Sequence, residues 1–124
     1  MQEVIIQNLN QPHVSPIKAS YCSTFFCRLR GLTFRRKLYP DRGLLLYQTR
    51  ETRLDAAIHM LFVWMDLAVI WINSSNEVVD VKLVRSWRPM YMPRRPAVYV
   101  LELNATRLKD FSVGDRIAIE KAMD

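Results

Sequence analysis

Apolar and polar residues alternate with a period of two along much of this chain. The clearest case is residues 98–103, VYVLEL, which as a strand would place Tyr99 on one face and Glu102 on the other. Residues 79–84 repeat the pattern, and the polar residues 73–76 before them are typical of a hairpin turn. These patterns predict strands that are buried on one or both faces.

Shorter apolar runs predict the remaining strands. They lie at 4–6, 13–20, 44–47 and 117–119. Pro16 lacks the amide hydrogen that a central strand needs, so it suggests that the second of these is an edge strand. The stretch 86–96 contains three prolines and is not expected to be regular structure, whereas residues 106–111 would form a helical turn.

One short helix is expected over residues 23–31. Ser23 suits the N-cap position, and Gly31 suits the C-cap because glycine adopts the left-handed conformation without penalty. Apolar residues at helical spacing form a stripe along it: Cys22, Phe25, Phe26, Leu29 and Leu32. Seven or eight short strands with one short helix favour a mainly β fold, a compact β-sandwich or barrel, over a parallel α/β fold.

The longest apolar stretch is residues 56–72, AAIHMLFVWMDLAVIWI, in which 15 of 17 residues are apolar. It reaches only the lower edge of the length that a bilayer requires, and a central Asp66 costs about 2.5 to 3.5 kcal/mol on insertion. Its β-branched and aromatic residues suit a buried sheet. We therefore expect two buried strands with a bend near Met65 and Asp66, and no membrane span.

The composition is that of a globular protein and identifies no reaction. The chain has 124 residues, 50% of them hydrophobic, which suffices for one packed core in a single domain over residues 1–124. The net charge of +6 is local, because residues 1–50 carry eight Lys and Arg against two acids, whereas residues 51–124 carry ten of each. Basic clusters at 28–42 and 85–95 would attract anions if folding brought them together.

Neither the cysteines nor the histidines form a recognised ligand pattern. Cys22 and Cys27 match neither a Cys-x-x-Cys redox motif nor zinc spacing, and His13 and His59 have no ligand-like neighbours. We expect two reduced thiols, no metal and no cofactor. The first ten residues lack the basic and long apolar regions of a signal peptide, which predicts a cytoplasmic protein.

Four polar residues form a candidate cluster within the apolar pattern. His59 and Asp66 interrupt the longest apolar stretch and invite an acid–base or metal role, although buried polar groups are more often satisfied by internal hydrogen bonds. Two such residues without a third ligand fall short of a metal site. Arg30 would lie at the carbonyl end of the expected helix, where the helix dipole favours a cation. The alternative is an ion pair between Arg30 and Glu102 across the core, which would explain a charge on the inner face of that strand.

A loop rich in arginine and aromatic residues is the candidate binding surface. It has no acidic residue and contains Arg85, Trp87, Arg88, Tyr91, Arg94 and Arg95. Guanidinium groups pair with phosphates and carboxylates, and aromatic rings stack on bases. The alternative is a proline-braced loop whose Trp87 plugs one end of the core, and no nucleic-acid motif accompanies the patch. An anionic ligand or a protein partner is therefore favoured over nucleic acid.

Short motifs follow one another in a fixed order from about residue 13 to residue 120. They are Ala19, Arg30-Gly31-Leu32-Thr33, Gly43–Leu46, Ile58-His59-Met60, Ala68–Asn73, Ser86-Trp87, Val100–Leu103 and Gly114-Asp115. In order and spacing this set resembles the bacterial and archaeal family called domain of unknown function 192 (DUF192). The resemblance implies a compact, mainly β sandwich with jelly-roll character, and it implies no activity, substrate or cofactor.

The chain departs from the family pattern at positions that bear on function. Where the family usually carries Asp before its Val-x-Phe-Ile strand, this chain has Ala68, with Asp66 two positions earlier, and the terminal Asp of that strand is Asn73. Ser86 replaces the Pro before Trp, and Thr33 replaces Met. If the acidic position does chemistry in the family, this member has lost it.

The sequence therefore favours a non-catalytic binding or accessory module. Two alternatives stay open. The first is an anion or nucleic-acid binder that uses the arginine-rich surface, and the second is a small enzyme with a site near His59.

Overall fold

Strands dominate the part of the chain that the structure describes. The computed structural model describes residues 2–24, 27, 32, 37–60 and 63–122. The strands are β1 (Glu3–Asn8), β2 (Ile17–Cys22), β3 (Arg42–Thr52), β4 (Leu67–Ile72), β5 (Val78–Val84), β6 (Ala97–Asn104) and β7 (Ile117–Lys121), and a short 3-10 helix, η1, spans Ala105–Asp110. The predicted mainly β fold is confirmed.

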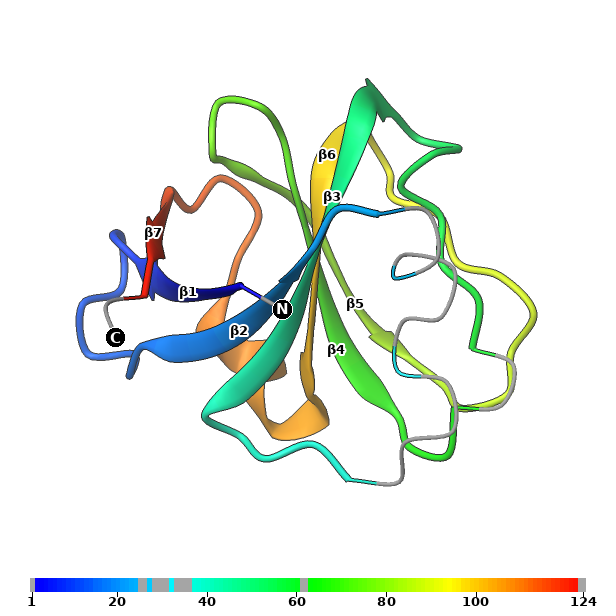
Figure 1. Cartoon of the computed structure of the whole chain (residues 1–124), viewed down its shortest axis with the longest axis horizontal. Coiled ribbons are helices and arrows are strands. Elements are labelled where there is room, and N and C mark those ends of the chain that lie inside the picture. The colour runs from blue at the N-terminus through cyan, green and yellow to red at the C-terminus, as the bar shows by residue number, and fades with distance from the viewer. Residues whose placement is uncertain (1, 25–26, 28–31, 33–36, 61–62, 123–124) are drawn as a thin grey trace.

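The strands form one curled sheet in the order β5-β4-β6-β3-β2-β1-β7. Neighbouring strands are antiparallel except β2 and β3, which run parallel. The two edge strands meet at one end, where Glu77 and Arg116 form a β-bridge and the N–H of Ile117 donates to the C=O of Asn76 at 2.8 Å. Figure 1 shows the result, a half-barrel with β1 and β7 on one side and the long loops on the other.

Each face of the sheet carries its own apolar core. The concave face gathers side chains from strands at both ends of the sheet, including Ile6, Ile70 and Ile117. The other face is covered by loops instead of a second sheet, and there Trp71 packs with Met60 and other loop residues. The β4 strand is buried at all six positions because it lies between β5 and β6 and both of its faces are covered.

The prediction of two strands across residues 56–72 is half wrong. Only β4 forms a ladder, and the described part of the preceding segment, residues 56–60 and 63–66, contributes a single isolated bridge, between Ile58 and Tyr91. The segment nevertheless buries Ala56, Ile58 and Met60 and leaves the residues between them half-buried. Burial alternates here because the segment lies over the sheet and covers it. The resulting period of two is the same as that of a strand.

Three further predictions concern one strand and two helical segments. The second strand begins at Ile17, after Pro16, and β2 lies between β1 and β3 instead of at an edge, because the proline precedes the ladder and interrupts none of its hydrogen bonds. The helix expected over 23–31 falls mostly outside the described residues. The helical turn predicted at 106–111 is confirmed as η1, which Asn104 caps by accepting from the N–H of Thr106.

Among the described residues, no helix is long and apolar enough to cross a membrane.

Candidate functional site

Two irregular segments lie side by side over the outer face of the sheet. Ile58 and Tyr91 exchange backbone hydrogen bonds, each of 2.9 Å, and the N–H of Met60 donates to the C=O of Arg88 at 2.9 Å. The N–H of Trp87 in turn donates to the C=O of Met60 at 2.8 Å. Backbone hydrogen bonds therefore join the 85–96 loop, which is the predicted binding surface, to the 56–66 segment.

This junction presents two tryptophans to solvent. Trp64 and Trp87 pack edge to face, with ring centroids 5.0 Å apart and ring planes at 82°. Trp64 is 48% exposed and Trp87 42%, and Met90, three residues after Trp87 in the same loop, is 57% exposed. We call these three residues the tryptophan platform. Large exposed apolar side chains that gather in one place mark interaction surfaces more often than singly scattered ones do.

The backbone at Trp87 is held in an uncommon conformation. Its φ of 66° lies in the left-handed region, which a bulky side chain rarely adopts. Neighbouring contacts fix this turn, because the Asp66 carboxylate accepts from the N–H of Ser86 at 2.8 Å and from the Arg85 guanidinium at 3.0 Å. The N–H of Arg85 donates to the Tyr91 hydroxyl at 2.9 Å. A conformation with this cost persists only where the surroundings determine it.

Asp66 thus acts as a clamp on the platform. The hydrogen bond from the Ser86 backbone, together with the Arg85 guanidinium, lowers the pKa of the Asp66 carboxyl below its usual value. The carboxylate therefore stays ionised at neutral pH and bonded to the turn that carries Trp87. Asp66 therefore has a structural role, in line with the interpretation that buried polar groups are satisfied by internal hydrogen bonds.

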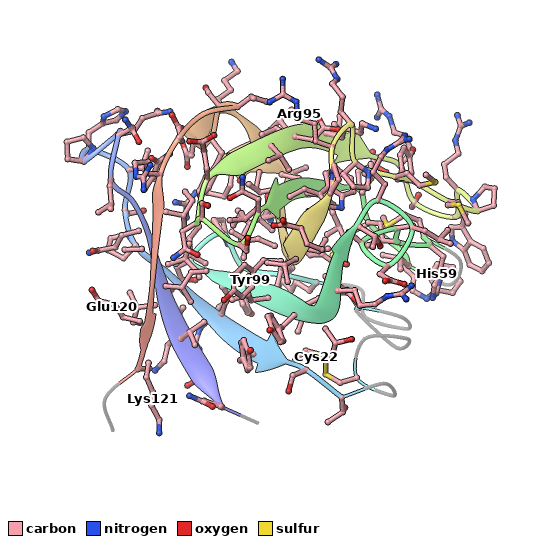
Figure 2. All side chains as sticks on the ribbon, turned by 90° about the horizontal axis from the view of Figure 1, so that it is seen from above. Cys22, His59, Arg95, Tyr99, Glu120 and Lys121 are labelled. Carbon is pink, nitrogen blue, oxygen red and sulfur yellow. A yellow bond between two sulfur atoms is a disulfide. The ribbon has the colours of Figure 1, made fainter. Side chains whose placement is uncertain are left out.

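The arginines of the predicted surface fall into two groups. Arg85 is paired with Asp66, whereas no carboxylate among the described residues lies within ion-pair distance of Arg88, Arg94 or Arg95. The backbone N–H of Arg94 donates to the buried Asp80 at 2.8 Å, which fixes the far end of the loop. Figure 2 shows Arg95 well apart from His59. Arg88 belongs to the same turn as the platform, and the other two lie toward the loop's far end.

The other candidate residues do not form one site with Asp66. Glu102 is buried on the loop-covered face, opposite Leu44 and Val69 on the neighbouring strands, and burial raises its pKa to about 7. No hydrogen bond or ion pair within the described ranges joins Asp66 to Glu102. His59 is half-buried between Ile58 and Met60. Arg30 lies outside the described residues, so its pairing with Glu102 stays a prediction.

The expectation of two reduced thiols is wrong. Cys22 and Cys27 form a disulfide with their Cα atoms 5.7 Å apart. This separation lies well inside the usual range for a disulfide, and a five-residue offset at a strand end can reach it by turning the chain. The spacing of the two cysteines matches no redox or zinc motif, but a tight turn allows other cysteine pairings as well.

No three His, Cys, Asp or Glu side chains in the described part of the chain come together as a metal site. A groove of about 520 Å³ runs beside β7 and the 74–76 turn, and none of the candidate residues lines it. On the concave face, Tyr47 packs against Tyr21 and Tyr99 on the adjacent strands, and burial with the neighbouring phenols raises the pKa of Tyr21 and Tyr99.

Sequence reasoning missed Trp64 and Met90. It placed Trp64 in a buried strand, because an apolar run does not reveal which of its side chains face the sheet and which face solvent. Trp71, seven residues later, is fully buried and donates its indole N–H to the C=O of Ala56 at 2.8 Å. The one signal in the sequence was Asp66, whose charge breaks the run near Trp64.

The fold and the site define a small β half-barrel whose outer face is layered by loops that carry an exposed aromatic platform. The chain belongs to the DUF192 family, whose model, described as Uncharacterized ACR, matches residues 6–119. The resemblance noted in the sequence is thereby confirmed.

Archaeal relatives support the assignment. A UPF0127 protein of Thermococcus kodakarensis is 36% identical over 82% of this chain and 64% of its own length. A UPF0127 protein of Pyrococcus furiosus is 37% identical over 82% of this chain and 85% of its own length. The matched region therefore spans less than two thirds of the first relative. The name UPF0127 describes no activity, so family membership leaves the function open.

Solved structures share the fold. A crystal structure from Sinorhizobium meliloti, named a "putative transcription regulator", has a TM-score of 0.78 at 24% identity and covers 95% of this chain and 92% of its own. A protein of unknown function from Novosphingobium aromaticivorans has a TM-score of 0.75 at 20% identity, over 94% of this chain and 83% of its own. At such identities the likeness extends to the fold alone.

Proposed function

We propose that this protein is a non-catalytic binding module and that a protein partner docks on the tryptophan platform. The observation that carries the proposal is a pair of exposed tryptophans held in one geometry by backbone hydrogen bonds and the Asp66 clamp. Tryptophan, arginine and methionine are enriched where protein interfaces gain most of their affinity. A surface that is ordered before binding loses less conformational entropy on docking.

An enzyme near His59 is the weaker alternative. Catalysis requires a nucleophile or acid–base pair within hydrogen-bond reach of a bound substrate. Asp66 is engaged by Ser86 and Arg85, and Glu102 is buried beneath the cover. The groove beside β7 is lined by none of these residues.

The cytoplasm is the proposed compartment, and the disulfide makes it testable. The cytosol keeps most thiols reduced, whereas oxidising compartments preserve disulfides. If the chain resides there, reduction would open the Cys22–Cys27 disulfide of the structure, and rapid alkylation of intact cells should label both cysteines. If both resist alkylation until a reductant is added, the protein resides in an oxidising compartment or is oxidised where it acts.

The docking proposal is tested by affinity capture with matched variants. Trp64→Ala and Trp87→Ala each remove one ring of the platform, and Leu54→Ala removes an exposed apolar side chain that is not part of it (68% exposed). The wild type and Leu54→Ala should each capture a partner that neither tryptophan variant captures. That partner, once purified, should bind again to the wild type and to Leu54→Ala. Equal purified affinity for all four chains would overturn the proposal. Circular dichroism confirms that each variant is folded.

A further inference from the structure

We infer that the platform takes an acidic polypeptide segment that brings one apolar side chain to the two tryptophans and sets carboxylates against the arginines around them. This inference rests on the proposed function and adds the chemistry of the partner. Three independent features of the described residues support it: the charge of the 85–96 loop, the geometry of the ring pair, and the way in which the Asp66 carboxylate is already used.

The 85–96 loop, which carries Trp87, has side-chain charges of a single sign. From residue 85 to residue 96 the loop carries four arginines and no acid, and Asp66 is the only acid in the 56–66 segment. Because Asp66 is paired with Arg85, the guanidiniums of Arg88, Arg94 and Arg95 remain without a carboxylate among the described residues. A partner with the opposite charge would approach faster and bind with better complementarity.

The ring geometry favours a side chain over a nucleobase. Single-stranded nucleic acids bind where successive aromatic faces are open to stacking along a basic groove. Here the edge of one indole meets the face of the other at 82°, so the pair forms an angled corner and not a flat stack. Such a corner suits an aliphatic or aromatic side chain, which gains free energy mainly by leaving water.

The Asp66–Arg85 pair shows how a carboxylate binds in this neighbourhood. One carboxylate oxygen accepts from a guanidinium and the other from a backbone N–H. Charge-assisted bonds of this kind are shorter and stronger than neutral ones. Arg88 is the residue after Trp87, and its exposed guanidinium can receive a partner's carboxylate in the same manner.

Synthetic peptides test the partner's chemistry directly. The probe is a short peptide of glutamates around one central leucine, and the comparison peptides replace the glutamates with glutamine or the leucine with alanine. Binding is followed by calorimetry and by the fluorescence of Trp64 and Trp87. We expect the glutamate–leucine peptide to bind about tenfold more tightly than either comparison peptide. Its affinity should fall as salt rises, since the charge contribution is screened.

Variants locate the site. Arg88→Gln and Trp64→Ala should each weaken binding of the acidic peptide by about threefold to tenfold. Arg116→Gln removes an exposed arginine on the β7 side and serves as the matched control, with affinity unchanged. Equal binding of the acidic and glutamine peptides would overturn the inference, as would tighter binding of a single-stranded oligothymidylate.

The outcomes also separate this inference from the docking proposal. A captured partner that depends on Trp64 and Trp87 but binds through a neutral or basic segment would refute the acidic chemistry and leave the docking function intact. A dimer that dissociates in Trp64→Ala would show a second copy of this chain as the occupant and refute the inference as well. If no tryptophan variant alters any binding, both proposals fail.

Discussion

Glu102 carries a carboxyl into an apolar layer. It lies between β3 and β4 on the loop-covered face, opposite Leu44 and Val69, and is 5% exposed. Because burial penalises the charged form, its pKa rises from 4.5 to about 7. The folded chain therefore holds a proton between these two values that the unfolded chain has released, so the free energy of unfolding falls as pH rises through that window.

Replacing Glu102 should remove this pH dependence. At about pH 8 we expect Glu102→Gln to raise the free energy of unfolding by up to about 3 kcal/mol, and at about pH 4, below the unfolded pKa, the difference should nearly vanish. Urea denaturation at the two pH values measures both. A variant that is less stable than the wild type at the higher pH would contradict the expectation and would indicate an opposing cation, such as the Arg30 that the sequence analysis pairs with Glu102.

The backbone at Trp87 makes a second prediction at this scale. Glycine adopts a φ of 66° freely, whereas a Cβ in the left-handed region costs about 1 to 2 kcal/mol. Trp87→Gly should therefore be more stable than Trp87→Ala by about 1 kcal/mol, as judged by thermal unfolding. Trp64, which has no such φ, is the control, and there the alanine variant should be the more stable. The same order at both positions would refute this account.

Among the elements, β2 and β3 form the one parallel pair, and a parallel pair needs a crossover connection. The disulfide fastens the beginning of that crossover to the end of β2, since Cys22 is the last residue of the strand and is 1% exposed. Cys27 packs against the core on the loop-covered face, beside the layer that holds the platform. The disulfide thus stabilises both the end of β2 and the loops that cover this face of the sheet.

Loss of the disulfide should destabilise the protein measurably. A disulfide that closes so short a loop restricts the unfolded chain by about 2 kcal/mol. We expect Cys22→Ala with Cys27→Ala to lower the free energy of unfolding by about that amount or more, because Cys22 is also a core residue. The wild type treated with dithiothreitol provides the comparison without a change of side chains. Identical urea midpoints with and without reductant would contradict the prediction.

The strands also show which structural features an alternating sequence pattern can predict. Residues 98–103 and 79–84 form strands as predicted, because alternation along a strand and a hairpin turn are local properties. Residues 56–60 alternate in burial in the same way, but they form an isolated bridge with Tyr91 and no strand. The difference lies in whether a neighbouring backbone is free to pair, and that depends on residues far away in the chain.

At the scale of the whole molecule, closure of the half-barrel depends on Asp115. One carboxylate oxygen of this residue accepts hydrogen bonds from the side chains of Asn8 and Gln11 and from the backbone of Ser112, at 2.8 to 2.9 Å. The C=O of Asp115 accepts from Val78, so the same residue joins β7 to β5. Three donors on one oxygen connect the two ends of the sequence at the point where the sheet edges meet.

Removing this acceptor should loosen the closure. Asp115→Ala leaves the buried Asn8 amide without one of its partners, and we expect a loss of about 3 kcal/mol in the free energy of unfolding. Faster hydrogen exchange at the amides of Gly114 and Ile117 should accompany it. Glu120→Ala, an exposed change on β7, serves as control and should lie within about 0.5 kcal/mol of the wild type. Unaltered exchange in Asp115→Ala would refute the assignment.

The sequence by itself determined the mainly β class, most strand positions and the family, because alternation, turn residues and motif order are properties of neighbouring residues. It also indicated the arginine loop and Trp87 as a candidate surface. Only the tertiary structure decided that Trp64 joins Trp87 in solvent, that Asp66 clamps their turn, and that Cys22 and Cys27 are bonded. Each of these depends on which segment covers which face of the sheet, and that choice is made by packing between residues distant in the chain, which no local pattern encodes.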